Sequence, residues 1–339
     1  MKEHLDLLLK NGAKVYVANV DTTMDEVEGF PVTVNDEEYG NAWVCSPYTH
    51  YVTYAKEELR ELDGRVLRAV LNVALSGVGA LCRATRVNKV ALVNNWLLST
   101  NLYPAVDAAQ VDRATDKLLE RYPDHAIGFC SVNSELLPLF TDGFVLVPSR
   151  SISIADPGTQ TARHRKRWRR DLRLIERTGY TVEVPGPDDA PRIIELYNLL
   201  YLDKYSRNNP QFTERFIREL PLSYRVLVKD GRIDGVLGYF ERNGVMTTPI
   251  FGYDTALPQA TGLYRMLSAV VYDLADREAL LVNDSAGAAG FKRLRGAVPD
   301  IEYRAVFVAH LPWRRRMGWK ALAMLLDRIA VPLMRRYEL

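Results

Sequence analysis

Cysteine is scarce in this sequence, and the few cysteines lie far apart. Cys45, Cys82 and Cys130 are the only three in 339 residues, an odd number without the close spacing of a zinc site or a disulfide framework. This pattern predicts free thiols in a reducing compartment, so we expect a cytoplasmic protein. The five histidines are scattered and form no set with cysteine, serine or aspartate, so we expect no metal site.

Long apolar runs and a strong net charge are also missing. The first ten residues include Glu3, His4 and Asp6 and do not resemble the apolar core of a signal peptide. We find no stretch of about 18 apolar residues and therefore expect no transmembrane segment. Lys and Arg number 44 against 42 Asp and Glu, so the net charge of +2 gives no overall field that favours nucleic acid or an anionic membrane.

The chain is long enough for two domains and shows a repeated order of elements. With 339 residues and 47% hydrophobic content it exceeds most single cores. A strand, a polar loop with proline, a long helix, a short strand ending in asparagine, a short helix, a glycine and a strand describe both 89–154 and 245–308. We interpret this order as two related domains, although unrelated α/β chains can alternate in the same way. The predicted units are an N-terminal domain over 1–155, a basic linker or helix over 156–178, a C-terminal domain over 179–312 and an amphipathic helix over 313–339.

Aromatic and β-branched residues predict strands near the N-terminus. We expect strands over 14–20 and 30–34, and one or two more over 41–54 (NAWVCSPYTHYVTY). Leucines and valines at helical spacing then predict a helix over 56–82, although two glycines weaken its end.

The stretch 245–296 carries the clearest functional signal. Residues 246–253 are apolar and aromatic and predict a buried strand, and 255–262 predict a loop. A helix should follow from Leu263, because apolar residues recur at three- and four-residue steps. Residues 279–282 predict a short strand that ends at Asn283, Asp284 and Ser285. Polar residues at such strand ends commonly line a site.

A run of positive charge precedes the C-terminal half. Eight basic residues fall between Arg163 and Arg177, around Trp168. This run can bind the phosphate of a nucleotide, a carrier arm or RNA, with Trp168 available for base stacking. A solvated face of a surface helix is the alternative and has equal weight.

Tyrosines recur at positions 197, 201 and 205 of the next predicted helix. At this spacing they lie on one helix face and point together. Such a stripe is more typical of a core or of the wall of a groove than of a catalyst.

The C-terminal half resembles a known fold. A helix, an antiparallel meander, the strand, loop and helix of 245–276 and the elements of 279–308 are similar to the GCN5-related N-acetyltransferase (GNAT) fold. The paired halves, GLYR at 262–265 and AGFKRLRG ending at Gly296 are similar to the tandem FemAB-like and peptidoglycan-type acyltransferases. The resemblance implies an α/β (α+β) fold with tandem GNAT-like domains, each a mixed central sheet flanked by helices.

The resemblance also implies a donor site. In this superfamily the loop after the fourth strand presents backbone N–H groups to the pyrophosphate of acyl-CoA at a helix N-terminus. The corresponding stretch here is LPQATGLYR, 257–265, which lacks the second glycine, so an acyl carrier protein or an aminoacyl-tRNA remains a candidate donor. The loop 99–104 has no glycine, and we expect no donor site in the N-terminal half. The predicted donor-binding residues are Gln259, Thr261, Gly262, Leu263, Tyr264, Arg265, Lys292 and Arg293.

Acyl transfer to an amine needs a deprotonated nucleophile, a held carbonyl and an acid for the leaving group. The resemblance makes Tyr253 and Asp254 the candidate acid and base, with Asn283 and Ser285 facing the same cleft. Alternatively, Asp254 caps a turn and Ser285 caps the next helix. The predicted substrate-binding residues are Tyr201, Lys204, Tyr205 and Asp284.

We therefore predict an acyltransferase that moves an acyl group from a thioester, acyl-CoA or acyl carrier protein, to an amine of an amino acid or specialised metabolite. The alternatives are a tRNA-dependent aminoacyltransferase of the Fem type and a catalytically silent binding protein with the same fold. The C-terminal helix is expected to pack on the core or on a second subunit, which makes a homodimer a further expectation. Peripheral membrane contact is the less favoured alternative for this helix.

Overall fold

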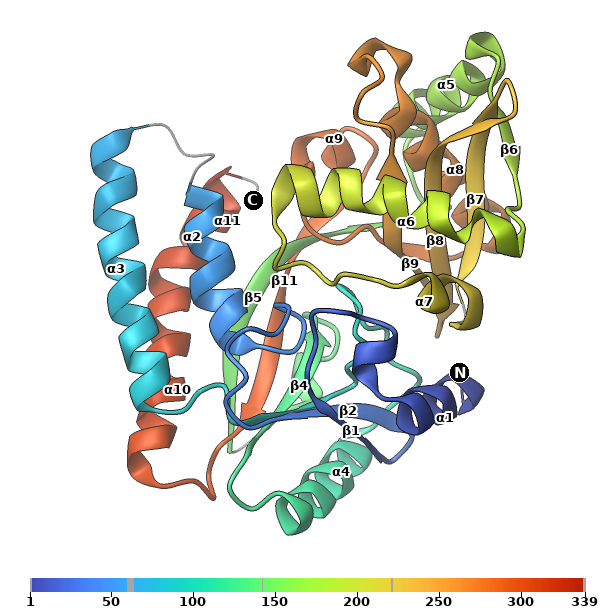
Figure 1. Cartoon of the computed structure of the whole chain (residues 1–339). Coiled ribbons are helices and arrows are strands. Elements are labelled where there is room, and N and C mark those ends of the chain that lie inside the picture. The colour runs from blue at the N-terminus through green and yellow to red at the C-terminus, as the bar shows by residue number, and fades with distance from the viewer. Residues whose placement is uncertain (1, 60–63, 142, 221, 338–339) are drawn as a thin grey trace.

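One mixed β-sheet runs through both halves of the chain in the computed structural model, which describes residues 2–59, 64–141, 143–220 and 222–337. Its eleven strands in these residues lie in the order β1-β2-β3-β4-β11-β5-β10-β9-β8-β7-β6. Helices cover the sheet on both faces (Figure 1). The predicted fold class is confirmed.

The N-terminal half supplies five strands and most of the helices at the left and base of Figure 1. Its helices are α1 (Lys2–Asn11), α2 (Ala55–Glu58), α3 (Arg65–Ala84) and α4 (Ala108–Arg121), with a π-helical turn η2 (Thr49–Tyr54) before α2. Its strands are β1 (Thr23–Val27), β2 (Phe30–Asn35), β3 (Val90–Val93), β4 (Ala126–Val132) and β5 (Phe144–Ala155).

The C-terminal half continues the sheet with six strands. They are β6 (Thr181–Glu183), β7 (Ser223–Lys229), β8 (Arg232–Arg242), β9 (Val245–Tyr253), β10 (Leu281–Asn283) and β11 (Val298–Phe307). The helices are α5 (Ala162–Thr178), α6 (Ala190–Asn198), the π-helical η6 (Leu199–Tyr205), α7 (Glu214–Glu219), α8 (Leu263–Glu278), α9 (Ala289–Arg293), α10 (Trp313–Leu325), η8 (Leu326–Ala330) and α11 (Val331–Tyr337).

The two halves exchange their last strands. β11 lies between β4 and β5 of the N-terminal half and is antiparallel to both. β5 in turn pairs antiparallel with β10. The repeat expected from the element order is visible, because β3–α4–β4 and β9–α8–β10 each hold a parallel strand pair joined by a helix. Each half therefore completes the sheet of the other, while the domain boundaries stay a prediction.

The hydrophobic core is likewise shared. One cluster joins Leu8 and Trp96 of the N-terminal half to Ile193 and Phe216 on α6 and α7. A second cluster packs α5 and α8 against the opposite face of the C-terminal sheet. Burial of apolar surface across both halves favours their folding as one unit.

Two of the strand predictions near the N-terminus are wrong. Residues 14–20 form a 3-10 turn and irregular chain, with only an isolated bridge from Val17 to Phe212. Residues 41–54 form turns and η2. The apolar residues there, such as Tyr16, Cys45 and Tyr51, are buried by contacts with distant segments, and those contacts override β-propensity. The predicted helix over 56–82 is two helices, α2 and α3, and positions 60–63 lie outside the described residues.

α3 bears on the expectation that the chain has no transmembrane segment. Within the described part of the chain it is the helix that has the length and composition to cross a bilayer, with a mean hydropathy of 1.4 over an 18-residue window. Only 11% of that window is buried. Arg68, Asn72 and Ser76 interrupt the apolar run, so a search for consecutive apolar residues misses it although the average is apolar.

The expected C-terminal helix is present as α10, η8 and α11. Trp319 and Leu322 of α10 are fully buried against the N-terminal half. This part of the chain therefore packs on the core.

Candidate functional site

β9 and β10 run parallel for three residue pairs and then separate. Leu281, Val282 and Asn283 of β10 pair with residues 245–247 of β9. Beyond that point, β9 continues to Tyr253 without a strand partner on this edge among the described residues. We call the resulting gap between the strands the β9–β10 opening. It leaves backbone groups of β9 without ladder partners, and such groups favour a ligand or water.

The N-terminus of α8 follows β9 through a short turn. Gln259–Thr261 form a 3-10 turn, and Gly262 then adopts the left-handed conformation with φ +80°. A Cβ at Gly262 would lie 2.8 Å from Leu174 Cδ2 on α5, so glycine is required there. The first N–H groups of α8 have no partner within the helix and carry the positive end of its dipole. This is the anion-binding geometry that the resemblance implies for residues 259–265.

A buried carboxylate ties this turn to α5. Asp171 is fully buried and accepts hydrogen bonds from Arg265, with Nε at 3.0 Å, and from Arg295. Arg170 Nε lies 4.0 Å from the same carboxylate. Three guanidinium groups share one negative charge, so positive charge remains near the N-terminus of α8. Arg265, predicted to bind donor, is half-buried and bound to Asp171.

Lys292, also predicted to bind donor, is turned inward. Its Nζ donates to the carbonyl oxygens of Asp284 at 2.6 Å, Ser285 at 3.2 Å and Ala286 at 2.9 Å. Three acceptors occupy the three N–H bonds of the ammonium. Burial lowers the pKa of Lys292. Lys292 therefore holds the loop after β10, while Arg293 lies exposed on α9.

Four predicted tyrosines meet at the β9–β10 opening, and we call Tyr201, Tyr205, Tyr253 and Tyr264 the tyrosine cluster. The rings of Tyr201 and Tyr205 are 6.1 Å apart, and those of Tyr253 and Tyr264 are 6.4 Å apart. Burial raises the pKa of Tyr264, and the nearby Asp284, Tyr201 and Tyr205 add to this effect. The rings of Tyr197 and Tyr201 also stack, with centroids 4.8 Å apart. This confirms the expectation that Tyr197, Tyr201 and Tyr205 point together.

Charged residues predicted to bind substrate lie beside the tyrosine cluster. Asp284, directly after β10, is partly exposed and accepts a hydrogen bond from Tyr272 at 3.1 Å. Burial raises the pKa of Tyr253, while the nearby Lys204 acts to lower it. The described site therefore offers phenols, one carboxylate and one exposed ammonium around the opening.

Asp254 belongs to a different network. Its carboxylate accepts from Arg192 Nη2 at 3.1 Å and from the N–H of Ala256 at 3.0 Å. It lies seven positions along β9 from Thr247, the partner of Asn283, which is roughly 20 Å at the usual strand rise. The structure does not bring Asp254 and Asn283 together. The turn-capping interpretation describes Asp254.

Asn283 and Ser285 shape the loop at the end of β10. Asn283 Oδ1 accepts the N–H of Ser285 at 3.1 Å, and Ser285 has a positive φ of 59°. Ser285 Oγ accepts from Arg150 Nη1 at 3.0 Å and from Thr100 Oγ1 at 3.2 Å. Ser285 therefore joins the two halves.

Residues of the N-terminal half form a second wall that the sequence analysis missed. Arg150 on β5 and Glu302 on β11 pair with Nε–Oε1 at 2.9 Å and Nη2–Oε2 at 3.2 Å, both nearly buried. Trp43 lies 5.5 Å from the guanidinium of Arg150. Burial, with Arg304 and Arg150 nearby, lowers the pKa of His50 to about 3. The sequence held one signal for this wall, because Arg150 and Glu302 are each a charged residue within a predicted strand.

Two π-helical segments bring these walls together. η2 carries Tyr54, and η6 carries Tyr201 and Tyr205; the pKa of Tyr201 is raised by burial and further by Tyr205 and Tyr54. Just after η2, Glu57 accepts hydrogen bonds from Ser206 and from Asn208 Nδ2, the latter at 3.1 Å. π-Helical turns are rare and frequently mark functional sites.

The equivalent gap in the N-terminal half is filled by its own loop. Residues 94–103 follow β3, and Tyr103 donates to the carbonyl of Cys130 on β4 at 2.7 Å. The N–H of Asn101 donates to Ser131 Oγ at 3.1 Å. Most side chains of this loop are buried. This packing leaves the gap between β3 and β4 closed, while the absence of a donor site from this half stays a prediction.

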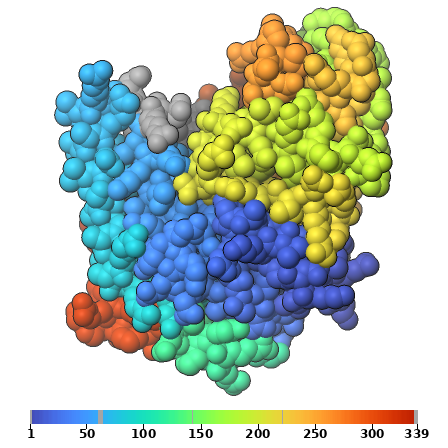
Figure 2. Space-filling model, viewed as in Figure 1, coloured from blue at the N-terminus to red at the C-terminus, as the bar shows by residue number. Residues whose placement is uncertain are grey.

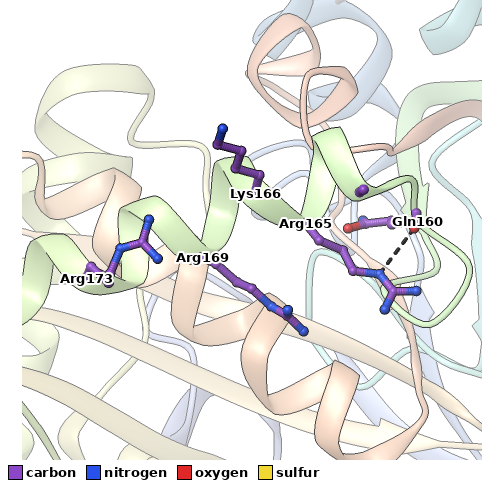
Figure 3. A pocket seen from close by; sticks show the side chains of 6 residues that line it. Gln160, Arg165, Lys166, Arg169 and Arg173 are labelled. Carbon is purple, nitrogen blue, oxygen red and sulfur yellow. Dashed lines mark hydrogen bonds between the residues drawn. The ribbon is translucent and has the colours of Figure 1, made fainter.

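The basic run forms one exposed face of α5. A cavity of about 560 Å³ lies along this face. Figure 3 shows its cationic side chains spread along the helix, and the lining residues are Gln160, Ala162, Arg165, Lys166, Arg169 and Arg173. Trp168 is buried and donates from Nε1 to Gln160 Oε1 at 3.0 Å, so its ring is not available for base stacking.

Within the described residues, no group of three or more His, Cys, Asp or Glu side chains is arranged to hold a metal ion.

Comparison with known proteins yields matches in structure alone. No protein-family model matches the sequence, and no curated protein matches it. The C-terminal domain of a protein assigned as a lysylphosphatidylglycerol synthetase from Agrobacterium fabrum superposes with a TM-score of 0.50 at 15% identity, over 70% of this chain and 81% of that chain. FemX gives 0.49 at 9% identity, over 68% and 83%. L-PGS from Bacillus licheniformis gives 0.48 at 16% identity, over 64% and 78%.

These structures confirm the fold that the sequence resembles. Acetyltransferases described as GCN5-related or as members of the GNAT family are also matched, at TM-scores of 0.35 and 0.30. At 15% identity the likeness to the Agrobacterium fabrum domain shows the fold alone and leaves activity, donor and acceptor open.

Proposed function

We propose that the protein is an acyltransferase that joins an acyl group to the amine of a small acceptor at the β9–β10 opening. The observation that carries this proposal is the separation of β9 and β10 beside the N-terminus of α8. The opening exposes β9 backbone groups that can hold a donor carbonyl, and the tyrosine cluster stands at its mouth.

The donor side suits a phosphate-bearing thioester, acyl-CoA or the arm of an acyl carrier protein. The N–H groups of residues 263–265 would hold a phosphate at the positive end of the α8 dipole. The excess positive charge of Arg170, Arg265 and Arg295 over Asp171 favours the same anion. Thioester donors supply an activated carbonyl carbon and a leaving thiolate.

The acceptor side supplies groups for proton transfer. The amine nitrogen would attack the carbonyl carbon, and the carbon–sulfur bond would break. Asp284 would take the proton from the amine, and Tyr253 would give a proton to the departing sulfur. Both lie beside the tyrosine cluster, whereas Arg192 and a turn N–H hold Asp254 away.

An aminoacyl-tRNA is the second candidate donor, and the exposed face of α5 favours it. Arg165, Arg169 and Arg173 repeat at four-residue spacing along one face, with Lys166 beside them. A row of cations of this kind can follow a polyphosphate backbone. A thioester donor needs no such row.

The test incubates the full chain separately with acyl-CoA, acylated carrier protein and aminoacyl-tRNA, and measures the retained mass by native mass spectrometry. Single-turnover transfer to amine acceptors follows with the donor that is retained. Tyr253→Phe and Asp284→Asn should each slow transfer by about 100-fold or more where a proton transfer is removed. Asp254→Asn, the control at the carboxylate that directly follows Tyr253, should transfer at close to the unsubstituted rate.

Two outcomes would count against this proposal. Retention of a donor without transfer to any amine would favour the catalytically silent binding protein. Loss of transfer in Asp254→Asn with normal rates in Asp284→Asn would mean that the wrong carboxylate has been chosen. We also propose the cytoplasm as the compartment, because the three cysteines are free and buried.

A further inference from the structure

α3 carries a second apolar face that nothing in the described structure covers. One face packs inward, with Gly79 and Cys82 buried against η2 and the sheet. The opposite face carries large apolar side chains that are mostly solvent-exposed. These are Val66 at 79%, Val73 at 73%, Val70 at 61% and Leu67 at 51% exposure. We call these four residues the α3 stripe.

The α3 stripe is a continuous feature of the helix. At 100° per residue its four members fall within about a third of the circumference. Small residues, Ala74, Gly77, Ala80 and Ala84, extend the same face to the end of α3. The helix is about 30 Å long at the usual rise, so the stripe is an elongated surface. Helices that are apolar on all sides are typical of buried cores or of membranes.

Figure 1 shows α3 as the outermost helix of the group that it forms with α2 and α10. In Figure 2 its light-blue side chains project at the left edge of the molecule, on the other side from the yellow and orange segments that include β9 and α8. The stripe is therefore accessible to a large flat partner without steric conflict with the candidate site.

The helices that carry and adjoin the α3 stripe have a net positive charge. α3 contains Arg65, Arg68 and Arg83 and has no acidic residue. On one flank of the stripe, Lys56 donates to Ser76 Oγ at 2.8 Å. The neighbouring segment 313–337 adds seven basic residues against the single acidic residue Asp327. α2 adds Glu57 and Glu58 beside Lys56, so the positive charges remain in excess. An apolar stripe on helices of net positive charge complements an anionic lipid surface.

We infer that α3 lies on an anionic membrane surface, with the α3 stripe in the headgroup and acyl boundary and with the net positive charge of α3 and segment 313–337 attracting lipid phosphates. A lying orientation follows from the packed face, because Gly79 allows close approach to Val52 and Tyr48 and Cys82 is buried. A spanning orientation would have to break those contacts. This inference stands apart from the proposed acyl transfer, and neither depends on the other.

A second copy of the chain fits the stripe less well. In a two-fold interface the same patch meets itself. Two copies of this net positive region would then lie near one another, and α3 itself offers no acidic side chain to offset the charge. Repulsion between like charges disfavours that arrangement.

The test is co-sedimentation of the full chain with vesicles of phosphatidylcholine alone and of equimolar phosphatidylcholine and phosphatidylglycerol. We expect binding to the anionic vesicles that weakens as salt is added, and little binding to the neutral ones. Val66→Gln/Val70→Gln/Val73→Gln should lower the partition coefficient by about 100-fold or more, because each buried valine contributes roughly tenfold. Glutamine suits a helix well, so α3 should persist.

A matched control replaces three exposed valines elsewhere. Val182, Val184 and Val298 are 39%, 70% and 65% exposed and lie in or beside strands β6 and β11. Their triple glutamine variant should bind vesicles like the unsubstituted protein. Val70→Asp is a second test of the stripe, since a single negative charge at its centre should abolish binding to anionic vesicles. Circular dichroism melting curves check that every variant folds.

Three results would overturn the inference. The first is absence of binding to anionic vesicles, and the second is equal loss of binding in the stripe and control variants. The third is a dimer in sedimentation velocity that the stripe variant converts to monomer while vesicle binding is unchanged, which would assign the stripe to a second copy.

Discussion

Replacement of Asp171 by asparagine tests how the α8 turn is held in place. Asp171 is fully buried, and the guanidinium groups of Arg265 and Arg295 donate to its two oxygens. Arg265 stands in the first turn of α8, and Arg295 follows α9. One carboxylate on α5 therefore fixes both segments that border the β9–β10 opening.

The expected loss of stability is large. Removing one partner of a buried ion pair typically costs about 3–5 kcal/mol, because an uncompensated charge is left in a low-dielectric region. Arg295 is in that position, with its side chain 6% exposed. Arg265 is 41% exposed and can be rehydrated, so it adds less. We expect Asp171→Asn to lower the free energy of unfolding by about 3–5 kcal/mol.

Asp276→Asn is the matched control on the same α5–α8 contact. Asp276 Oδ2 lies 3.5 Å from Arg169 Nη2, and both side chains have access to solvent. Such a pair contributes about 0–1 kcal/mol. Urea unfolding followed by tryptophan fluorescence gives both values, and amide hydrogen exchange reports on the first turn of α8. Equal, small effects of the two substitutions would refute the reasoning that Asp171 holds this turn.

Three further predictions follow from burial. Because the pKa of His50 is lowered from 6.5 to about 3, the unfolded chain takes up a proton between these pH values that the folded chain does not. The stability that neutral His50 contributes is therefore complete above pH 6.5 and is lost as the pH falls towards 3. Acid-unfolding curves of His50→Gln should show a smaller loss of stability over this range. Burial raises the pKa of Cys45 and Cys82 to about 12, so a thiol reagent should label none of the three cysteines in the folded protein and all three in denaturant, and a disulfide would contradict this. A Cβ at Gly252 would lie 2.6 Å from the backbone of Leu196, so Gly252→Ala should push α6 from β9 and lower the melting temperature, whereas the same change at the unobstructed Gly77 should not.

Periodicity was a sufficient guide where neighbouring residues determine structure. The strand predicted over 246–253 matches β9, and the helix predicted from Leu263 begins at that residue as α8. In both, the apolar pattern of the segment agrees with the face that it buries. The candidate donor loop was placed by the resemblance, and its Gly262 directly precedes α8.

Long-range contacts decided the elements that the sequence analysis missed. Residues 41–54 have the composition of strands, yet Cys45 and Tyr51 are buried in two different clusters and the chain follows those contacts. Asp254 looked like a partner of Asn283 because both were placed at strand ends. β10 is only three residues long and pairs with the start of β9, so the two ends lie far apart. Strand register of this kind is set by pairing partners and cannot be read from one strand.

The exchange of β5 and β11 explains why the missed wall lies where it does. Arg150 is on the last strand of the N-terminal half and Glu302 is on the last strand of the C-terminal half, and antiparallel pairing sets them opposite each other. Arg150 also donates to Ser285 in the loop after β10. The loop that borders the β9–β10 opening is therefore fastened to a strand of the other half. Without the N-terminal half, the loop after β10 would lose its contact with Arg150. The N-terminal half therefore contributes to the candidate site of the C-terminal half, although its own gap between β3 and β4 is closed.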